Sequence, residues 1–225
     1  MDVIDGLVLP FIKDIRPDGV CLNGDIVDCY SISDFDKNPK HLDWHLQNEI
    51  DQAGELMARL KQVKWKWWLG GNHEDRLRRL SWRTPGLGQL KAMEFPKLFE
   101  LDKYGFKWKP YGEYIELGKL TVTHGEFVRK HSGDSGMATL ERLGTSVLVG
   151  HTHRMGSYYR TDTRGVHGAW ENGCLCRLDP EYEHFPNWQQ GFSVVKVFDG
   201  GMFHVQQVPI INRRHLIYGD RTWRR

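Results

Sequence analysis

The sequence predicts one α/β domain with layered sheets, and three observations lead to this prediction. The first half of the chain alternates short apolar runs, which are typical of buried strands, with segments of helical periodicity. The last third is rich in strand patterns separated by glycine-containing turns. The length of 225 residues is enough for one sizeable core and short for two full domains. We therefore expect a single domain over residues 1–225.

The first half is predicted to alternate helices and strands. Apolar positions at helical spacing indicate a helix over residues 5–16, and a Pro-Asp-Gly break separates it from an apolar strand at 20–22. A long amphipathic helix is expected from 41 to about 63, and a second strand over 64–69. A shorter helix should run from 74 to about 80 and end before the next proline.

The second half is predicted to consist mainly of strands. The expected elements are strands at 107–110, 114–117 and 120–123, a helix at 138–143 and a strand at 146–149. The segments 193–198 and 202–208 flank Asp199-Gly200-Gly201 and are expected to form a hairpin with a primed turn. The basic tail is expected to be solvated.

Composition and charge exclude few classes of function. The net charge of +2 neither requires nor excludes a nucleic-acid partner, although it disfavours a broad DNA-binding surface. No apolar run approaches the roughly 20 residues needed to cross a bilayer, so no membrane partner is expected. The N-terminal segment lacks the features of a signal peptide. The four cysteines form no regular framework, which favours a reduced, cytoplasmic protein.

Four places in the chain share one pattern, in which an apolar strand runs into glycine and then into residues that bind metals. The segments are Gly24-Asp25-Ile26-Val27-Asp28, Gly71-Asn72-His73-Glu74, Thr123-His124-Gly125 and Gly150-His151-Thr152-His153. Ligands of α/β sheets gather at the carboxyl ends of strands, and glycine lets the backbone turn sharply there. Asp, Asn and His donors suit divalent metals such as Mn, Fe or Zn. We therefore expect the four segments to converge on one metal site.

The ordered set resembles the calcineurin-like metallophosphoesterases. Their pattern is Asp-x-His, then Gly-Asp-x-x-Asp, Gly-Asn-His-Asp/Glu, a His usually before Gly, and Gly-His-x-His. The last four blocks occur here in order between residues 24 and 153. The resemblance implies a layered α/β/β/α sandwich, in which two mixed sheets are flanked by helices.

The resemblance also implies a role for each matching residue. Asp25 would bridge two metals, and the ligands of one metal would be completed by Asn72, His124 and His151. His153 would bind the other metal.

The catalytic residues implied by the resemblance are His73 and Asp28. His73 would stabilise charge at the phosphate and protonate the leaving oxygen, and Asp28 would orient His73 and keep it protonated. The nucleophile would be a metal-bound water or hydroxide, activated by two divalent ions. Mn²⁺ is the expected metal, with Fe, Zn and Ni as alternatives.

The implied function is metal-dependent hydrolysis of a phosphate ester, by a phosphodiesterase, nuclease or phosphatase. The substrate stays open, with nucleic acid and nucleotides among the candidates. Arg76, Arg129 and His131 are candidate substrate contacts, because guanidinium groups suit phosphate and loops beside such sites often hold substrate. For Arg76, a solvated helix face is an equal alternative.

The sequence departs from the family pattern at its first block. No histidine precedes His41, so Asp-x-His is absent and the first strand is expected to be missing. One metal is left with only Asp25 and His153, so we expect one metal to bind well and the second poorly. Either the true start lies upstream or the site is incomplete. The alternative function is therefore a binding module of this fold with little or no activity.

Three weaker patterns are read as structural. His41 and His45 have zinc-compatible helical spacing but are expected on a surface helix face. Cys174-x-Cys176 lacks a partner pair and is expected in a strand. The cluster of Trp65, Trp67 and Trp68 could stack bases but is expected to pack within a strand.

Overall fold

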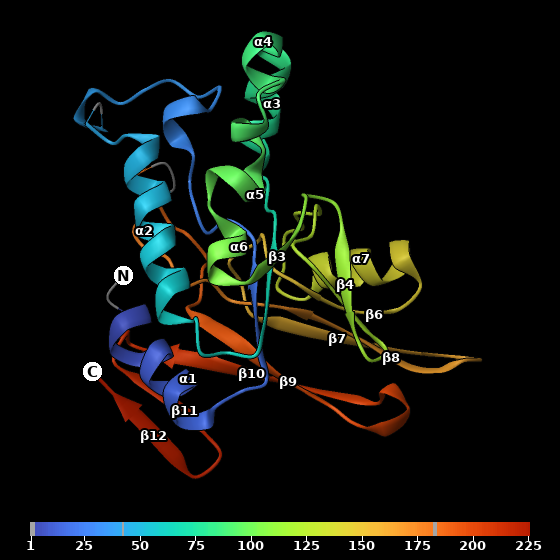
Figure 1. Ribbon diagram of the computed structural model, residues 1–225. Helices are drawn as coiled ribbons and strands as arrows, with labels where there is room; N and C mark the ends of the chain where they lie inside the picture. The colour runs from blue at the N-terminus through green and yellow to red at the C-terminus, as the bar shows by residue number, and fades with distance from the viewer. Residues whose placement is uncertain (1–2, 42, 182–183) are drawn as a thin grey trace. The chain divides into compact units, whose positions relative to one another are not determined.

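The computed structural model describes residues 3–41, 43–181 and 184–225, which form two compact units (Figure 1). Unit 1 comprises Met1–Arg16 and Tyr114–Arg225, and unit 2 comprises Pro17–Glu113. Both units contain helices and strands, so the α/β class is confirmed. The single domain over residues 1–225 stays a prediction.

Unit 2 is built on a parallel three-stranded sheet. Its strands β1 (Gly19–Asn23), β2 (Trp65–Leu69) and β3 (Phe106–Lys109) lie in the order β1-β2-β3. Asn23 pairs with Leu69, so β1 and β2 end side by side. The Gly-Asp and Gly-Asn-His segments that follow these strands therefore start from the same edge of the sheet.

Several helices connect the three strands of unit 2. The helices are α2 (Leu46–Arg59), α3 (Asp75–Arg83), α4 (Pro85–Gly88), α5 (Phe95–Leu98) and α6 (Leu101–Tyr104), with 3₁₀ turns η2 (Tyr30–Ile32), η3 (Pro39–His41) and η4 (Lys91–Met93). Figure 1 shows α3 to α6 as a run of short helices between β2 and β3. The prediction for α3 was correct in type, but the helix begins one residue later and ends three residues later than predicted, still before Pro85 as expected.

The predicted start of the long helix was wrong. Helix α2 begins at Leu46, because His45 has an extended backbone (φ −91°, ψ 146°) and His41 ends the separate turn η3. Leu42, which the prediction included, lies outside the described residues. His41 and His45 are both exposed, as expected, but they share no helix face.

An aromatic cluster fills the core of unit 2. Trp68 is fully buried and packs edge-on against Phe95 and Phe99, at centroid distances of 5.1 and 5.3 Å. Phe95 also stacks on Trp108 at 3.7 Å. The expectation that the tryptophans of β2 serve strand packing is confirmed for Trp68.

The first sheet of unit 1 is mixed and five-stranded. Strands β4 (Tyr114–Leu117), β5 (Leu120–Thr123), β6 (Ser146–Val149), β8 (Gly165–Glu171) and β7 (Gly156–Asp162) lie in the order β4-β5-β6-β8-β7. Strands β5 and β6 are parallel, with Thr123 beside Val149, so they end at one edge. Helix α7 (Asp134–Leu143) packs its buried Leu140 against Val147, Val149 and Ala169. It begins four residues before the predicted helix.

The second sheet of unit 1 is antiparallel and has the order β12-β11-β10-β9. Its strands are β9 (Gly191–Val197), β10 (Phe203–Ile211), β11 (His215–Tyr218) and β12 (Arg221–Arg224). The N-terminal helices η1 (Ile4–Val8) and α1 (Leu9–Ile15) pack on this sheet (Figure 1). Phe11 contacts Phe192, Tyr218 and Trp223 at centroid distances of 5.0 to 5.4 Å.

The predicted hairpin of β9 and β10 is confirmed, and one other local prediction in unit 1 was wrong. The hairpin turns through η5 (Asp199–Gly201), where Gly200 and Gly201 both have positive φ, as the central residues of a primed turn do. Cys174 forms an isolated bridge with Gln190, and Cys176 lies outside any strand. The described strands are divided among three sheets, of which only one is mixed, so the expected pair of mixed sheets is not seen as such.

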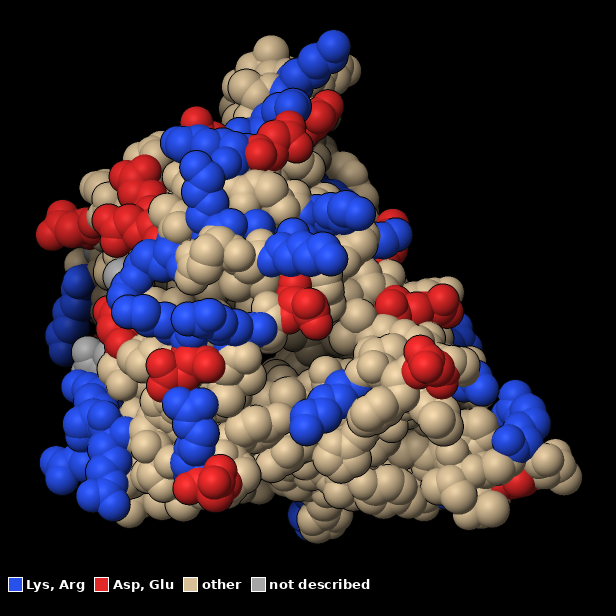
Figure 2. Space-filling view, turned by 60° about the horizontal axis from the view of Figure 1, so that its bottom comes forward, with Lys and Arg blue, Asp and Glu red and all other residues tan. Residues whose placement is uncertain are grey.

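One face of the molecule carries charged side chains of both signs. In Figure 2, Asp and Glu side chains lie among groups of Lys and Arg side chains on this face. Among the described helices, none has the length and apolar character that crossing a bilayer would require.

Candidate metal centre

The segment after β1 has a backbone that few residues tolerate. Gly24 has φ 85° and Asp25 has φ 53°, so the chain turns in the left-handed region directly after the strand. A Cβ on Gly71 would lie 2.0 Å from the Asp25 carboxylate, so only glycine fits there. The carboxylate accepts the backbone N–H of His73 at 3.0 Å. These contacts hold the Asp25 side chain against the start of the Gly-Asn-His segment.

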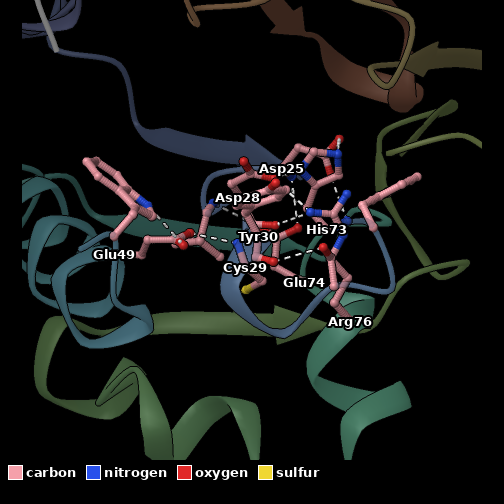
Figure 3. A network of polar contacts seen from close by, with 12 residues as sticks. Asp25, Asp28, Cys29, Tyr30, Glu49, His73, Glu74 and Arg76 are labelled. Atoms are coloured by element: carbon pink, nitrogen blue, oxygen red, sulfur yellow. Dashed lines mark hydrogen bonds and ion pairs between the residues drawn. The ribbon is translucent and has the colours of Figure 1, made fainter. Parts of the chain in front are cut away.

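Buried Glu74 joins the two segments of unit 2 (Figure 3). Its carboxylate accepts hydrogen bonds from four backbone N–H groups and one indole, those of Asp25, Ile26, Val27, Gly71 and Trp68. Burial and the neighbouring Asp25 carboxylate raise the pKa of Glu74, and the donors oppose part of that shift because they bind the ionised form. Glu74 thus fixes the position of Asp25 without facing solvent.

Glu49 of α2 supports the same loop. It is buried and accepts the backbone N–H of Cys29 at 2.7 Å and the indole N–H of Trp44 at 3.2 Å. The loop from Asp25 to Cys29 is therefore anchored at both ends by buried carboxylates (Figure 3).

His73 and Asp28 form a hydrogen-bonded pair (Figure 3). Nδ1 of His73 lies 2.9 Å from Oδ1 of Asp28, and Nε2 lies 3.9 Å from Oδ2 of Asp25. An ionised carboxylate only accepts hydrogen bonds, so Nδ1 carries the proton shared with Asp28. The ring is thereby oriented with Nε2 toward Asp25. The contact between these two side chains is the one that the resemblance implies, and their catalytic role stays a prediction.

Arg76 also binds Asp28. Its Nη1 donates to the Asp28 carbonyl at 2.6 Å and to Oδ1 at 2.8 Å, and its guanidinium lies 5.5 Å from the Phe35 ring. Burial alone would raise the pKa of Asp28, but hydrogen bonds and charge from His73 and Arg76 hold it below its usual value. Arg76 thus keeps Asp28 ionised, and its contact with substrate stays a prediction.

In unit 1, two of the predicted metal ligands lie side by side. His124 follows β5 and His151 follows β6, and their ring centroids are 5.2 Å apart. The Gly150 N–H donates to the His124 carbonyl at 2.9 Å, which ties the two strand ends together. His124 is buried and His151 is half-buried.

The Gly-His-Thr-His segment turns through two strained residues. His151 has φ 66° and His153 has φ 59°. Between them, buried Thr152 donates its hydroxyl to Glu171 at 2.9 Å. Glu171 is fully buried and also accepts the backbone N–H groups of Ser135 and Gly136 at the start of α7. Glu171 therefore fixes the segment that carries both histidines.

The loop that carries the candidate substrate residues Arg129 and His131 is held in place by hydrogen bonds from buried Arg154. Buried Arg154 donates to the carbonyls of Arg129 and Lys130 at 2.6 and 2.8 Å. The Arg129 N–H donates to Ser135 Oγ at 3.0 Å. The side chains of Arg129 and His131 are exposed, as a substrate contact requires, and that role stays a prediction.

His153 has a different neighbour from His151. Its ring lies edge-on to the indole of Trp188, with centroids 4.4 Å apart. The backbone N–H of Gln189 donates to the His153 carbonyl at 2.9 Å. The segment before β9 is thus joined to the last predicted metal ligand.

The donor set fits a borderline divalent metal. Asp25 in unit 2 and His124 and His151 in unit 1 are candidate ligands by residue type, and Asn72 is half-buried between Gly71 and His73. Asp25, His151 and His153 are non-glycine residues with positive φ. Such conformations cost roughly 1–3 kcal/mol each and are found at functional sites.

The supporting residues were not found from the sequence. Glu74 stands inside a quoted motif, but no role was predicted for it. No role was predicted for Glu171 or Arg154 either. A charged residue at the end of an apolar strand pattern, as in Ala169-Trp170-Glu171, was the available signal.

Two phage proteins are similar to this chain over most of its length. The Gene 54 protein of Mycobacterium phage L5 is 30% identical over 236 aligned residues, covering 96% of this chain and 90% of that protein. This chain belongs to the Gene 54 protein family. The Gene 54 protein of Mycobacterium phage D29 is also 30% identical, covering 94% of this chain and 89% of its own length. No known protein-family profile matches the chain.

Proposed function

We propose that this Gene 54 family member is a metal-dependent hydrolase of phosphate esters, of the phosphodiesterase, nuclease or phosphatase type. The observation that carries the proposal is the His73–Asp28 pair, with an Nδ1 to Oδ1 distance of 2.9 Å. A structural metal site needs no oriented imidazole of this kind, whereas ester hydrolysis needs an acid for the leaving oxygen.

The proposed metal ligands are those of the calcineurin-like metallophosphoesterases, which the motifs resemble. They are Asp25 and Asn72 from unit 2, and His124, His151 and His153 from unit 1. A bound divalent metal, with Mn²⁺ preferred, would polarise a phosphate oxygen and lower the pKa of a coordinated water. The motifs in these residues supply more donors for one metal than for the other, so the proposal includes one strong and one weak metal site.

The residues of unit 2 have separate tasks in this proposal. Asp28 holds Nδ1 of His73, so Nε2 is the atom that would give its proton to the leaving oxygen. Arg76 helps to keep Asp28 ionised, so the Asp28 carboxylate remains an acceptor for Nδ1 of His73. Glu74 and Gly71 keep the Asp25 carboxylate in place.

We also propose that the protein is located in the cytoplasm, because the cysteine pattern favours a reduced protein. Fractionation of the cells that produce it would test this location.

Chelation is the first test of this function. The full chain should hydrolyse bis(4-nitrophenyl) phosphate with Mn²⁺, lose that activity in excess chelator and regain it when Mn²⁺ is restored. Asp25→Ala and His151→Ala should lose both bound metal and activity, because each removes a ligand. His204→Ala, at an exposed position of β10, is the matched control and should retain both.

Two results would contradict the proposal. Hydrolysis that persists after complete chelation would exclude the metal mechanism. Metal bound without any turnover of mono- or diesters would instead support the alternative of a binding module.

A further inference from the structure

One exposed loop of unit 1, the cationic loop, comprises residues 126–132 and connects strand β5 to helix α7. Arg129 and Lys130 are adjacent in this loop, and both are exposed. Neither side chain forms an ion pair with any described residue, although exposed Glu126 lies in the same loop. The cationic loop therefore presents two positive charges to solvent that no carboxylate of the described residues pairs with.

The backbone of the cationic loop is fixed at its ends. Gly125 and Gly133 flank it with φ 92° and 93°, in the left-handed region. A Cβ on Gly156 would lie 2.5 Å from the Gly133 nitrogen, so the end of the loop packs closely against β7. The Arg129 N–H donates to Ser135 Oγ at 3.0 Å. Because the loop is already ordered, little conformational entropy would be lost when it binds a ligand.

Arg154 fixes the middle of the cationic loop from inside unit 1. It is only 8% exposed, and its guanidinium donates to the Arg129 and Lys130 carbonyls at 2.6 and 2.8 Å. Within the described part of the chain, Arg154 forms no ion pair. A buried charge without a counter-charge is unfavourable, and two neighbouring cations add like-charge repulsion. An anion bound at the loop would relieve both costs.

The exposed side chains of the loop suit a phosphate group. The guanidinium carbon of Arg129 lies 5.6 Å from the centroid of the Phe127 ring, a cation–π contact that orients the side chain. A guanidinium can donate two parallel N–H bonds to phosphate oxygens, and the Lys130 ammonium adds a compact charge. Both side chains are exposed, so a ligand reaches them without any opening of the fold.

We propose that Arg129 and Lys130 form a subsite for a phosphate group of the substrate, and that Arg154 is the positioning residue of this subsite. Arg154 holds the backbone of the two residues and would not itself touch the phosphate. A phosphate monoester carries a charge of about −1.5 to −2 at neutral pH, which matches two cations better than a singly charged carboxylate does. This inference deepens the proposed hydrolase function and rests on it.

Binding to the full chain in excess chelator tests the subsite without metal or turnover. NMR titrations at constant ionic strength should show that phenyl phosphate binds at least roughly threefold more tightly than benzoate, which carries less charge. Arg129→Ala and Lys130→Ala should each weaken phenyl phosphate binding roughly three- to tenfold. Arg142→Ala, at an exposed position of α7, is the matched control and should bind as wild type does.

Two results of these titrations would overturn the inference. One is equal affinity of wild type and the double variant Arg129→Ala, Lys130→Ala for phenyl phosphate. The other is benzoate binding as tight as that of phenyl phosphate, since the site would then recognise carboxylates equally well.

Variants of Arg154 test its positioning role. Arg154→Met should weaken phenyl phosphate binding about as much as Arg129→Ala does, and Arg154→Lys should restore part of the loss because an ammonium can still donate to a loop carbonyl. In the double variant lacking Arg129 and Lys130, Arg154→Met should cause no further loss, because it acts through these residues. Losses that add in full would overturn the positioning role.

Arg154 is buried, so thermal melting must first show that its variants are folded. If Arg154→Met unfolds, Arg154→Lys decides. It should then bind phenyl phosphate with an affinity between those of wild type and Arg129→Ala, and wild-type affinity would overturn the positioning role.

Kinetics with Mn²⁺ separate this inference from the proposed function. For an ester that the chain hydrolyses, Arg129→Ala and folded Arg154→Met should raise KM and leave kcat close to wild type. Metal-dependent hydrolysis with unchanged KM in both variants would overturn the subsite and leave the hydrolase standing. Phenyl phosphate binding that depends on Arg129 and Arg154, without hydrolysis of any ester, would support the subsite and contradict the hydrolase.

Discussion

Single carboxylates determine the geometry of the candidate site. The Glu74 carboxylate accepts hydrogen bonds from five donors in two segments. The Glu171 carboxylate accepts hydrogen bonds from two backbone N–H groups and one hydroxyl. Neither residue is a proposed ligand. Each positions the residues that are, namely Asp25 in one case and His151 with His153 in the other. Removing such an acceptor leaves several buried donors unpaired at once, which costs more than one average hydrogen bond.

Glu74→Gln tests this role in unit 2. Whichever oxygen becomes an amide nitrogen, it will face N–H groups that previously donated to it. The free energy of unfolding should fall by about 2–4 kcal/mol, measured by urea unfolding in chelator. The control is Glu55→Gln, an exposed position on α2, which should change stability by less than about 0.5 kcal/mol. A Glu74 variant as stable as this control would show that the network is not structural.

The lowered pKa of Asp28 predicts how the stability of the folded chain changes with pH. Its pKa in the folded chain is lowered from 3.8, after His73 and Arg76 outweigh the effect of burial. A depressed pKa means that the stabilisation is fully present above about pH 4 and is lost as the pH falls through the folded value. The stability difference between wild type and Asp28→Asn should therefore be present at pH 5 and shrink below pH 4. A difference that grows on acidification would reverse this assignment. Urea midpoints in chelator provide the measurement.

At the scale of elements, helix α7 depends on a neighbouring strand for its N-terminus. Its first residue follows Gly133, which has no side chain to cap the helix, and Glu171 at the end of β8 accepts the N–H groups of Ser135 and Gly136 instead. The same carboxylate holds Thr152. Helix α7 and the histidine segment therefore share one anchor.

Hydrogen exchange of two amides tests this shared anchor. In Glu171→Leu, the amides of Ser135 and Gly136 should exchange faster than in wild type, because the acceptor oxygen that both amides share is removed. Glu141→Leu, at an exposed position of the same helix, is the control and should leave both rates unchanged. Unchanged protection in the Glu171 variant would mean that the helix start does not depend on this carboxylate.

The elements that the sequence predicted best have strong local signals. The strands at 114–117 and 120–123 were predicted with their observed bounds, because a turn glycine separates two short alternating runs. The start of α2 was misjudged because polar and aromatic residues before Leu46 continue the helical pattern without forming the helix. Strands β7 and β8 were not delimited, since glycine and polar residues interrupt their apolar pattern.

The candidate site was predictable only in part for a similar reason. Asp25, His73, His124 and His151 lie in short motifs that local sequence reveals. The bonds of Glu74 to residues near Asp25 span 47 to 49 positions, and those of Glu171 to α7 span 35 and 36. Partners so far apart leave no periodic pattern in one sequence, so only the fold identifies them.

At the scale of the whole molecule, residues of both units belong to the proposed hydrolase. Unit 2 would supply the His73–Asp28 pair together with Asp25 and Asn72, and unit 1 would supply three histidines. The mixed surface charge suits a small ester at least as well as a long nucleic acid. The central claim is that His73 acts in the chemical step at a metal site and does not merely help to bind the metal.

The most direct test compares His73→Ala with His41→Ala, an exposed histidine of the same unit, at saturating Mn²⁺. Metal content and the rate of phosphodiester hydrolysis are measured on the same samples. We expect wild-type metal content in both variants, with a rate reduced about 10²–10⁴-fold only in His73→Ala. A His73→Ala rate equal to that of His41→Ala, at equal metal content, would contradict a role of His73 in the chemical step.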